Sequence, residues 1–322
     1  MITVHAADGA PEVGPGDDLA ALVVDLFDLA DGDVVAVTSK VVGKAEGRVR
    51  SGTREDELAA ETSRVVARRG PTTIVRTRHG LTLAAAGIDA SNVAPGSVVL
   101  LPEDPDASAR AIRESVRARS GRNVGVLVTD TAGRAWREGQ TDIAIGAAGL
   151  RVLVDFSGSV DPHGNELAVT APAVADELAG AAELAQGKLA ARPFAVVRGR
   201  ADLVLPPGEH GRGAAALVRP EGADLFGYGA REAVIRALRA DPDDQVAFGT
   251  PAGPEELAAA VRTALPQAVV HADHDVVVVS GAERASIAAL AFAFGWNPVA
   301  RPEQATADSP EADPVRLRPS TP

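Results

Sequence analysis

The chain has 322 residues, a formal net charge of −12, 46% hydrophobic residues and no cysteine. This length is enough for about two domains, whose cores must be built from Val, Ala and Leu because only 3% of the residues are aromatic. The negative charge argues against nonspecific nucleic-acid binding. The lack of cysteine excludes disulfides, thiolate nucleophiles and cysteine-ligated zinc.

The sequence predicts a cytoplasmic protein that does not enter a membrane. Residues 1–18 have neither the basic start nor the long apolar run of a signal peptide. A stretch of about 18 apolar residues without charge, which a membrane helix requires, does not occur. We therefore expect small-molecule partners rather than nucleic acids or lipids.

The first part of the chain predicts helices alternating with short apolar strands. Asp17 and Asp18 are suitable residues for starting a helix that runs to about residue 30. The elements expected after it are a strand at 34–37, a short loop with Lys44, a helix-permissive stretch at 54–69, strands at 72–77 and 98–102, and a helix at 104–119.

The most informative stretch is the apolar run from Val124 to Val128 and the residues after it. An unbroken β-branched run is typical of a buried parallel strand, because helices cover both faces of such a sheet. The run stops at Thr129, Asp130 and Thr131, after which we expect a glycine-bearing loop. Ligands of open α/β sheets bind beyond the carboxyl ends of the strands, so these polar residues predict a ligand site.

The remaining sequence predicts further elements and two boundaries. We expect strands at 150–156, 167–170 and 193–199, helices at 172–191 and 223–240, and a mobile loop at 200–222. The character changes near residue 245, so we expect one domain over 1–244, a short helix-strand-helix extension over 245–300, and a disordered tail over 301–322.

Three polar groups follow apolar segments and suggest one shared site. They are Ser39 with Lys44, Asp89 with Asn92, and Asp130 with Thr131. A single polar strand end is usually a turn or a helix cap. Three in one chain favour phosphoryl transfer, in which carboxylates hold divalent ions that bridge phosphate oxygens and a lysine neutralises charge.

Other polar residues keep two interpretations. His79 is either a structural residue or a catalyst, and Arg134 and Arg137 either bind an anion or pair with Glu138 at the surface. The loop at 200–222 is either disordered or a lid over the substrate. The chain has no GxxxxGK[ST] motif, so a bound nucleotide would be held by a less familiar scaffold.

Five long segments resemble the coenzyme F420:L-glutamate ligases, also called F420-0:gamma-glutamyl ligases, and they occur in that family's order. The resemblance covers roughly residues 5–240 and implies an α/β (α+β) fold in two subdomains, assembled as an intertwined homodimer. A flavin-binding, nitroreductase-like domain that is often fused to such ligases is not expected here. The segments are VVAVTSKVVGKAEGRV, TRHGLTLAAAGIDASNV, VLVTDTAGRAWREGQTDIAIG, DPHGNELAVTAPAVADELAGAAELAQGK and PFAVVRG.

The resemblance implies GTP-dependent ligation of L-glutamate to coenzyme F420-0. GTP would phosphorylate the terminal carboxylate of F420-0, the glutamate amine would attack the acyl phosphate, and GDP and phosphate would leave. The family uses two divalent cations, Mg²⁺ or Mn²⁺, and a potassium ion. Two alternatives stay open: a related ligase with another acceptor, and a non-catalytic nucleotide-binding subunit of a split ligase complex.

Site residues follow from the same resemblance, motif by motif. Asp130 and Lys44 are implied as catalytic residues. Asp89 and Asp130 are implied as metal ligands, with Thr131 binding the second metal. The implied GTP contacts are Ala10, Pro11, Glu12, Val13, Ser39, Lys44, Asn92, Gln186, Gly187 and Lys188.

The chain departs from the family at one position. Many members have Glu or Gln after the glycine that follows the ADELAGAAEL helical segment, as a further metal ligand, but this chain has Lys188 after Gly187. A charged lysine cannot coordinate a cation. Either Gln186 substitutes, or a water molecule does, or Lys188 contacts phosphate directly.

Overall fold

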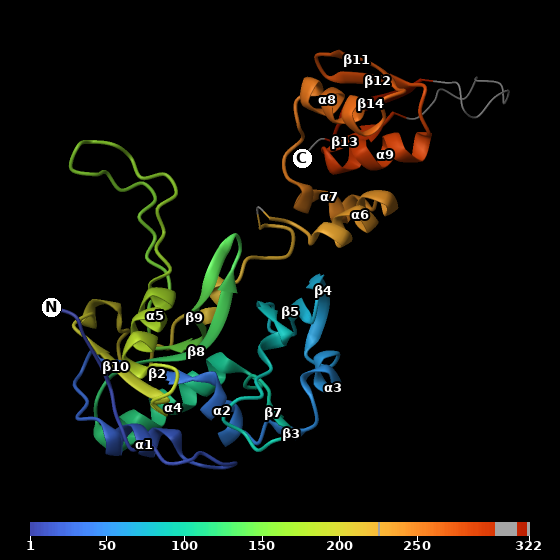
Figure 1. Cartoon of the computed structure of the whole chain (residues 1–322). Helices are drawn as coiled ribbons and strands as arrows, with labels where there is room; N and C mark the ends of the chain where they lie inside the picture. Colours follow the sequence, from blue (N-terminus) through green and yellow to red (C-terminus); the bar gives the residue numbers. More distant parts are fainter. Residues whose placement is uncertain (225, 300–313, 321–322) are drawn as a thin grey trace. The chain divides into compact units, whose positions relative to one another are not determined.

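The computed structural model describes residues 1–224, 226–299 and 314–320, and the chain divides into two compact units, Met1–Val218 and Arg219–Pro322 (Figure 1). The boundary expected after residue 244 is therefore wrong. The helix at Ala230–Arg239 packs on a helix of the second unit, Arg284–Ala293, so it belongs to that unit.

The first unit mixes helices and strands throughout, which confirms the mixed α/β class. Its helices are α1 Leu19–Leu26, α2 Ser39–Ala45, α3 Arg54–Leu58, α4 Pro105–Ser120 and α5 Val174–Gln186. Its strands are β1 Thr3–Ala6, β2 Val34–Thr38, β3 Val49–Ser51, β4 Thr62–Arg69, β5 Thr72–Thr77, β6 Thr82–Ala84, β7 Ser97–Val99, β8 Gly125–Arg134, β9 Arg137–Ala148 and β10 Phe194–Arg198.

A five-stranded sheet in the order β1-β10-β2-β8-β9 forms the centre of this unit. Only β2 and β8 are parallel, with Thr38 paired to Thr129, and the other neighbours are antiparallel. Because parallel strands end at the same edge of a sheet, this register places the residue after Thr38 beside the residue after Thr129.

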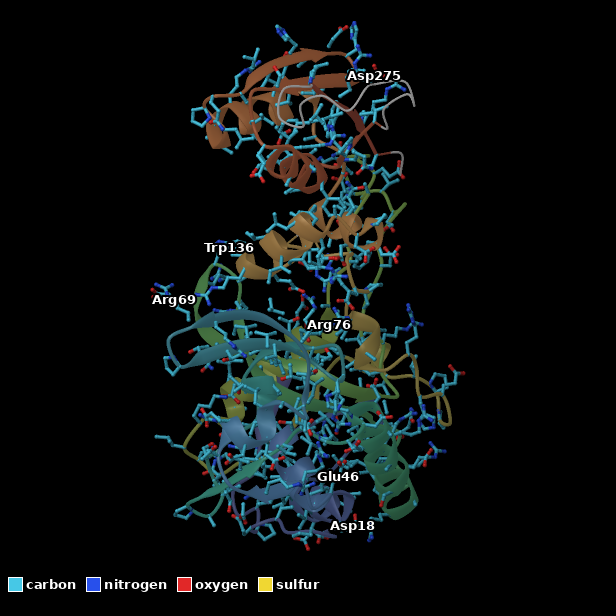
Figure 2. All side chains as sticks on the ribbon, turned by 90° about the vertical axis from the view of Figure 1, so that its right-hand side faces the viewer. Asp18, Glu46, Arg69, Arg76, Trp136 and Asp275 are labelled. Carbon is cyan, nitrogen blue, oxygen red and sulfur yellow. The ribbon has the colours of Figure 1, made fainter. Side chains whose placement is uncertain are left out.

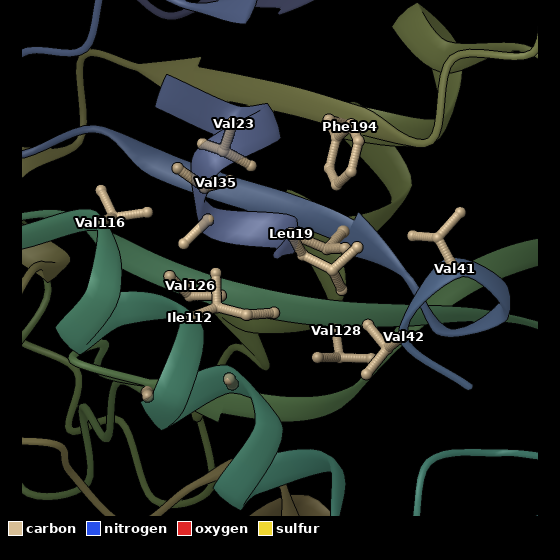
Figure 3. Packing of buried hydrophobic residues seen from close by; sticks show 14 of the residues in the cluster. Leu19, Val23, Val35, Val41, Val42, Ile112, Val116, Val126, Val128 and Phe194 are labelled. Atoms are coloured by element: carbon tan, nitrogen blue, oxygen red, sulfur yellow. The ribbon is translucent and has the colours of Figure 1, made fainter. Parts of the chain in front are cut away.

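Alternating side chains of the central strands pack into two apolar layers. Val126 and Val128 lie in the cluster with α1 and α4, whereas Leu127 lies in the cluster with α5. Figure 3 shows the first layer, in which Ile112 of α4 and Val23 of α1 gather over the strands. The predicted burial of the Val124–Val128 run on both faces is therefore confirmed.

The glycine-bearing loop expected after Thr131 is wrong, because β8 continues to Arg134 and forms a hairpin with β9. Beyond Thr129, the pairing of β8 with β2 ends, while its pairing with β9 continues to Arg134. Trp136 lies at the hairpin turn with 81% of its surface exposed (Figure 2). A polar two-stranded ribbon lacks the apolar alternation by which strands are recognised in sequences.

Two further segments of the first unit differ from the expectations. Residues 150–156 do not form a strand of the sheet. Leu150 bridges Val204, and the residues from 153 onward form one side of an arm, paired through Phe156 N–H to Thr170 O at 2.9 Å. The segment 205–210 is held by the buried Arg113, which donates to the carbonyls of Leu205, Pro206 and Glu209. This part of the expected mobile loop is thus anchored to the protein core.

The second unit contains a four-stranded sheet in the order β11-β12-β14-β13. Residues 315–319 form a strand of it, so the expectation of a disordered tail is wrong there, and residues 301–313 and 321–322 lie outside the described residues. The elements are α6 Ala230–Arg239, α7 Pro242–Gln245, α8 Pro254–Ala264, α9 Arg284–Ala293, β11 Val269–Asp273, β12 Val276–Ser280, β13 Trp296–Pro298 and β14 Val315–Pro319. In the described parts of both units, no helix has the length and apolarity that crossing a membrane requires.

Candidate active site

The pair Ser39 and Asp130 forms where β2 and β8 end side by side. Ser39 is the first residue of α2 and directly follows Thr38, the last residue of β2. Its buried hydroxyl donates to Asp130 Oδ1 at 2.8 Å, across 91 residues of sequence. The parallel register of the two strands therefore brings together two of the three predicted polar groups.

Asp130 has an unusual protonation equilibrium. Burial is the largest cause that raises its pKa to about 7, and the negative charges of Asp142 and Asp89 act in the same direction. The Ser39 hydroxyl and the Thr131 backbone N–H donate to this group and oppose the shift. A carboxyl with several negative neighbours is stabilised by a cation, so the electrostatics favour a positively charged ligand at this point.

Asp89 is held close to the same place by Lys40. Its backbone pairs with Val99, and its Oδ2 lies 2.6 Å from Lys40 Nζ. Ser91 donates its backbone N–H to Oδ1 of Asp89 at 2.7 Å. Partial burial opposes ionisation of Asp89, but the hydrogen bonds from Lys40 and Ser91 outweigh it and hold its pKa below the usual value.

Lys44 faces the N-terminal loop from the same helix. Its ammonium is buried and pairs with the carboxylate of Glu12, which is largely exposed. The loop around Glu12 is fixed by Val13, which is buried in the core with α1. Contrary to the loop expected around it, Lys44 lies in the last turn of α2. Asn92 lies exposed in the turn after Asp89, with a left-handed φ of 54°.

The opposite face of β8 carries a second polar group, centred on Asp142 of β9. Successive side chains of a strand point to opposite faces, so Thr129 and Thr131 point away from the Ser39 side. Both hydroxyls donate to the buried Asp142 carboxylate, Thr131 at 2.7 Å and Thr129 at 3.3 Å. Lys188 Nζ lies 2.7 Å from Thr131 Oγ1 and 3.3 Å from Asp142 Oδ1.

Lys188 follows the end of α5, where Gly187 turns the chain with a positive φ of 63°. Its ammonium also pairs with Glu183 of that helix at 2.7 Å. Partial burial opposes the charged form of Lys188, but the Glu183 hydrogen bond and the Asp142 charge outweigh it and raise its pKa. Gln186, only 1% exposed, finds no hydrogen-bond partner for its side-chain amide among the described residues.

All three lysines of this chain lie in these two polar groups, although arginines number 29. Lys40 contacts Asp89, Lys44 contacts Glu12, and Lys188 contacts Thr131. A compact ammonium and a planar guanidinium are not interchangeable at a binding site. The occurrence of lysine at these three positions alone favours a role that arginine does not fill.

Residues 9–61 and 51–199 match the model of the family described as F420-0:Gamma-glutamyl ligase, which covers more than half of the chain. The chain belongs to this ligase family. The resemblance expected from the sequence is therefore confirmed, and the matched region contains every predicted site residue, from Ala10 to Lys188.

Three proteins from archaea show the extent of the similarity to other members. The coenzyme F420:L-glutamate ligase of Methanopyrus kandleri is 40% identical over 235 residues, which are 67% of this chain and 93% of that protein. The protein of the same name from Haloarcula marismortui is 42% identical over 61% of this chain and 86% of its own. The protein of the same name from Archaeoglobus fulgidus is 39% identical over 62% of this chain and 88% of its own.

The candidate ligands for a divalent cation in this family member are two carboxylates. Asp130 and Asp89 offer hard oxygen ligands, and Mg²⁺ is usually held by one or two carboxylates together with water and phosphate oxygens. Within the described residues, no group of three or more His, Asp or Glu side chains is arranged to enclose a metal ion. The ammonium of Lys188 contacts Thr131, which the sequence predicts as the ligand of the second metal.

The predicted residues outside these groups lie elsewhere in the ligase fold. His79 Nε2 lies 3.1 Å from the carbonyl of Glu103, beside a pocket of about 290 Å³ that Asp106 and Val218 help to line. Arg134 donates to the carbonyl of Glu138 at the exposed end of the β8-β9 hairpin, which supports the surface interpretation for this arginine.

Four residues of the site are not predicted from the sequence: Lys40, Ser91, Asp142 and Glu183. Asp142 is the most important of them, because it accepts hydrogen bonds from both threonines of β8. A hairpin interpretation of residues 125–148 would have found it, since Asp142 pairs directly with Thr131 across the ribbon. The loop expected after Thr131 concealed this pairing.

Proposed function

We propose that this chain ligates L-glutamate to coenzyme F420-0 with GTP as the phosphoryl donor. The observation that carries the proposal is the family match over residues 9–199, together with relatives whose names state an F420:L-glutamate ligase. The pairing of Asp130 with Ser39 and of Asp89 with Lys40 supports phosphoryl transfer, because it combines carboxylates, a hydroxyl and ammonium groups.

The reaction proceeds in two steps. An oxygen of the terminal carboxylate of F420-0 forms a bond to the γ-phosphorus of GTP, and the bond from that phosphorus to the bridging oxygen breaks, which releases GDP. The glutamate amine then forms a bond to the acyl carbon, loses a proton, and expels phosphate. The product is gamma-glutamylated F420, a substrate for further rounds.

We assign roles to the chain's residues from their surroundings. The buried ammonium of Lys44 and the hydroxyl of Ser39 bind GTP phosphates, with Lys44 exchanging its exposed partner Glu12 for phosphate. The loop Ala10–Val13 and Asn92 contact the rest of the nucleotide. Asp130 and Asp89 hold Mg²⁺ or Mn²⁺, which neutralises the phosphate charge when bound. The resemblance also implies a potassium ion, for which we assign no ligand.

The arm over residues 153–172 supports the proposal of a homodimer. It extends from the remainder of the first unit (Figure 1) and exposes Leu153, Phe156, Val160 and Val169, the last at 90%. Apolar side chains gathered on an extended segment are typical of a protein-protein contact. A second copy of the chain is the partner that the intertwined assembly of the family implies.

The test is to incubate the purified chain with F420-0, L-glutamate, GTP and Mn²⁺, and to follow the products by mass spectrometry. We expect an increment of one or more glutamyl residues and the formation of GDP. Asp130→Asn should lose this activity while keeping its fold, whereas Asp25→Asn, at an exposed site on α1, should keep it. A folded wild-type protein that forms no glutamylated product contradicts the proposal.

A further inference from the structure

The ammonium of Lys188 stands where three oxygen-bearing side chains converge from three elements. Thr131 comes from β8, Asp142 from β9 and Glu183 from α5, and their oxygens lie 2.7, 3.3 and 2.7 Å from Nζ. A hydroxyl and two carboxylates are the hard oxygen donors that a divalent cation prefers. The lysine thus sits among ligands that would otherwise suit a metal ion.

The local chain geometry holds Lys188 in this position. α5 ends at Gln186, and the left-handed Gly187 reverses the chain so that Lys188 reaches back to Glu183. Asp142 is only 3% exposed, and its other partners are the uncharged hydroxyls of Thr129 and Thr131. A buried carboxylate needs a compensating positive charge, and in the described part of the chain Lys188 supplies it to Asp142.

A divalent cation cannot share this place with the ammonium. An ammonium has no lone pair to donate, and two cations in contact with the same Thr131 oxygen would repel each other in a partly buried site. The residues beside Thr131 therefore do not fit the second metal that the family resemblance implies. On the Asp130 side, the ammonium of Lys40 pairs with Asp89. The side chain of Asp130 itself accepts from the Ser39 hydroxyl, so a divalent ion at Asp130 does not share a ligand atom with an ammonium.

We propose that Lys188 replaces the second divalent cation, so that the chain binds one divalent ion, at Asp130, and supplies the second positive charge from its own sequence. This inference rests on the proposed ligase function. Lys188 is on this view a positioning residue, which fixes the Thr131 hydroxyl and neutralises Asp142.

The test counts bound Mn²⁺ on the full chain by electron paramagnetic resonance, with Mn²⁺ alone as the probe. We expect one ion for the wild type and two for Lys188→Gln, whose amide oxygen can coordinate a cation. Arg192→Gln removes a positive charge four residues away, where the arginine pairs with Asp8, and should leave the count at one. The count needs no turnover, so it is independent of the ligation assay.

Each other outcome contradicts the inference. Two ions on the wild type would show that the ammonium moves aside, and none would show that Asp130 does not hold a divalent ion. A count of one for Lys188→Gln would show that the ammonium is not what excludes the second ion. Should Lys188→Gln not fold, Lys188→Met removes the same charge, and it should raise the Mn²⁺ count above one.

Discussion

The stability of the metal-free protein should depend on pH through Asp130. Its pKa lies at about 7 in the folded chain against 3.8 for an ordinary carboxyl, so the folded state holds this proton more tightly than the unfolded state. The resulting stabilisation is complete below about pH 4 and is lost as the pH rises through about 7. At about 1.4 kcal/mol per pH unit, the loss between pH 5.5 and pH 8 comes to about 2 kcal/mol.

Urea unfolding at both pH values, in the presence of a chelator, measures this loss. Asp130→Asn has no proton to release at this position, so its free energy of unfolding should fall by about 2 kcal/mol less than that of the wild type over the same interval. Histidines and other groups titrate in both proteins and cancel in the difference. Equal pH dependence in the two proteins would refute the elevated pKa and its electrostatic cause.

Two structural predictions concern how the site is supported. Gly146→Ala should destabilise the protein by about 3 kcal/mol in thermal or urea unfolding, because the added Cβ would lie 2.2 Å from the carbonyl oxygen of Pro105. The control is Gly133→Ala on the same hairpin, whose Cβ would meet nothing within 4 Å and which should change the stability little. Arg113→Met should cost about 3 kcal/mol because buried carbonyls lose their donor, while Arg117→Met, exposed on the same helix, should stay within about 0.5 kcal/mol. Equal stability within either pair would contradict these assignments.

The central strand was predictable because it is buried on both faces. Its unbroken apolar run Val124–Val128 is typical of a buried strand, and the polar residues where the run stops fall in the site. The proximity of Ser39 and Asp130 is also predictable, because the parallel strands β2 and β8 end at the same edge of the sheet. The strand and the polar residues at its end were predictable because burial requires a continuous run of apolar residues, which can be read directly from neighbouring positions in the sequence.

The parts that could not be predicted depend on partners distant in sequence or on polar pairing. The β8-β9 ribbon leaves the sheet after Thr129 and carries polar residues on both faces, so no periodicity marks Asp142 as a neighbour of Thr131. Strand β14 follows a segment rich in Pro, Ala and Asp and pairs with β12, more than thirty residues earlier. Composition alone therefore suggested disorder where residues 315–319 complete a sheet.

The ligation of glutamate through an acyl phosphate is tested most directly with F420-0 labelled with ¹⁸O in its terminal carboxylate. One carboxylate oxygen passes to phosphorus in the first step and leaves with phosphate in the second. We predict glutamylated product and one ¹⁸O atom in the phosphate released with the first glutamate added. Unlabelled phosphate alongside glutamylated product, or no product from the folded chain, would contradict the account.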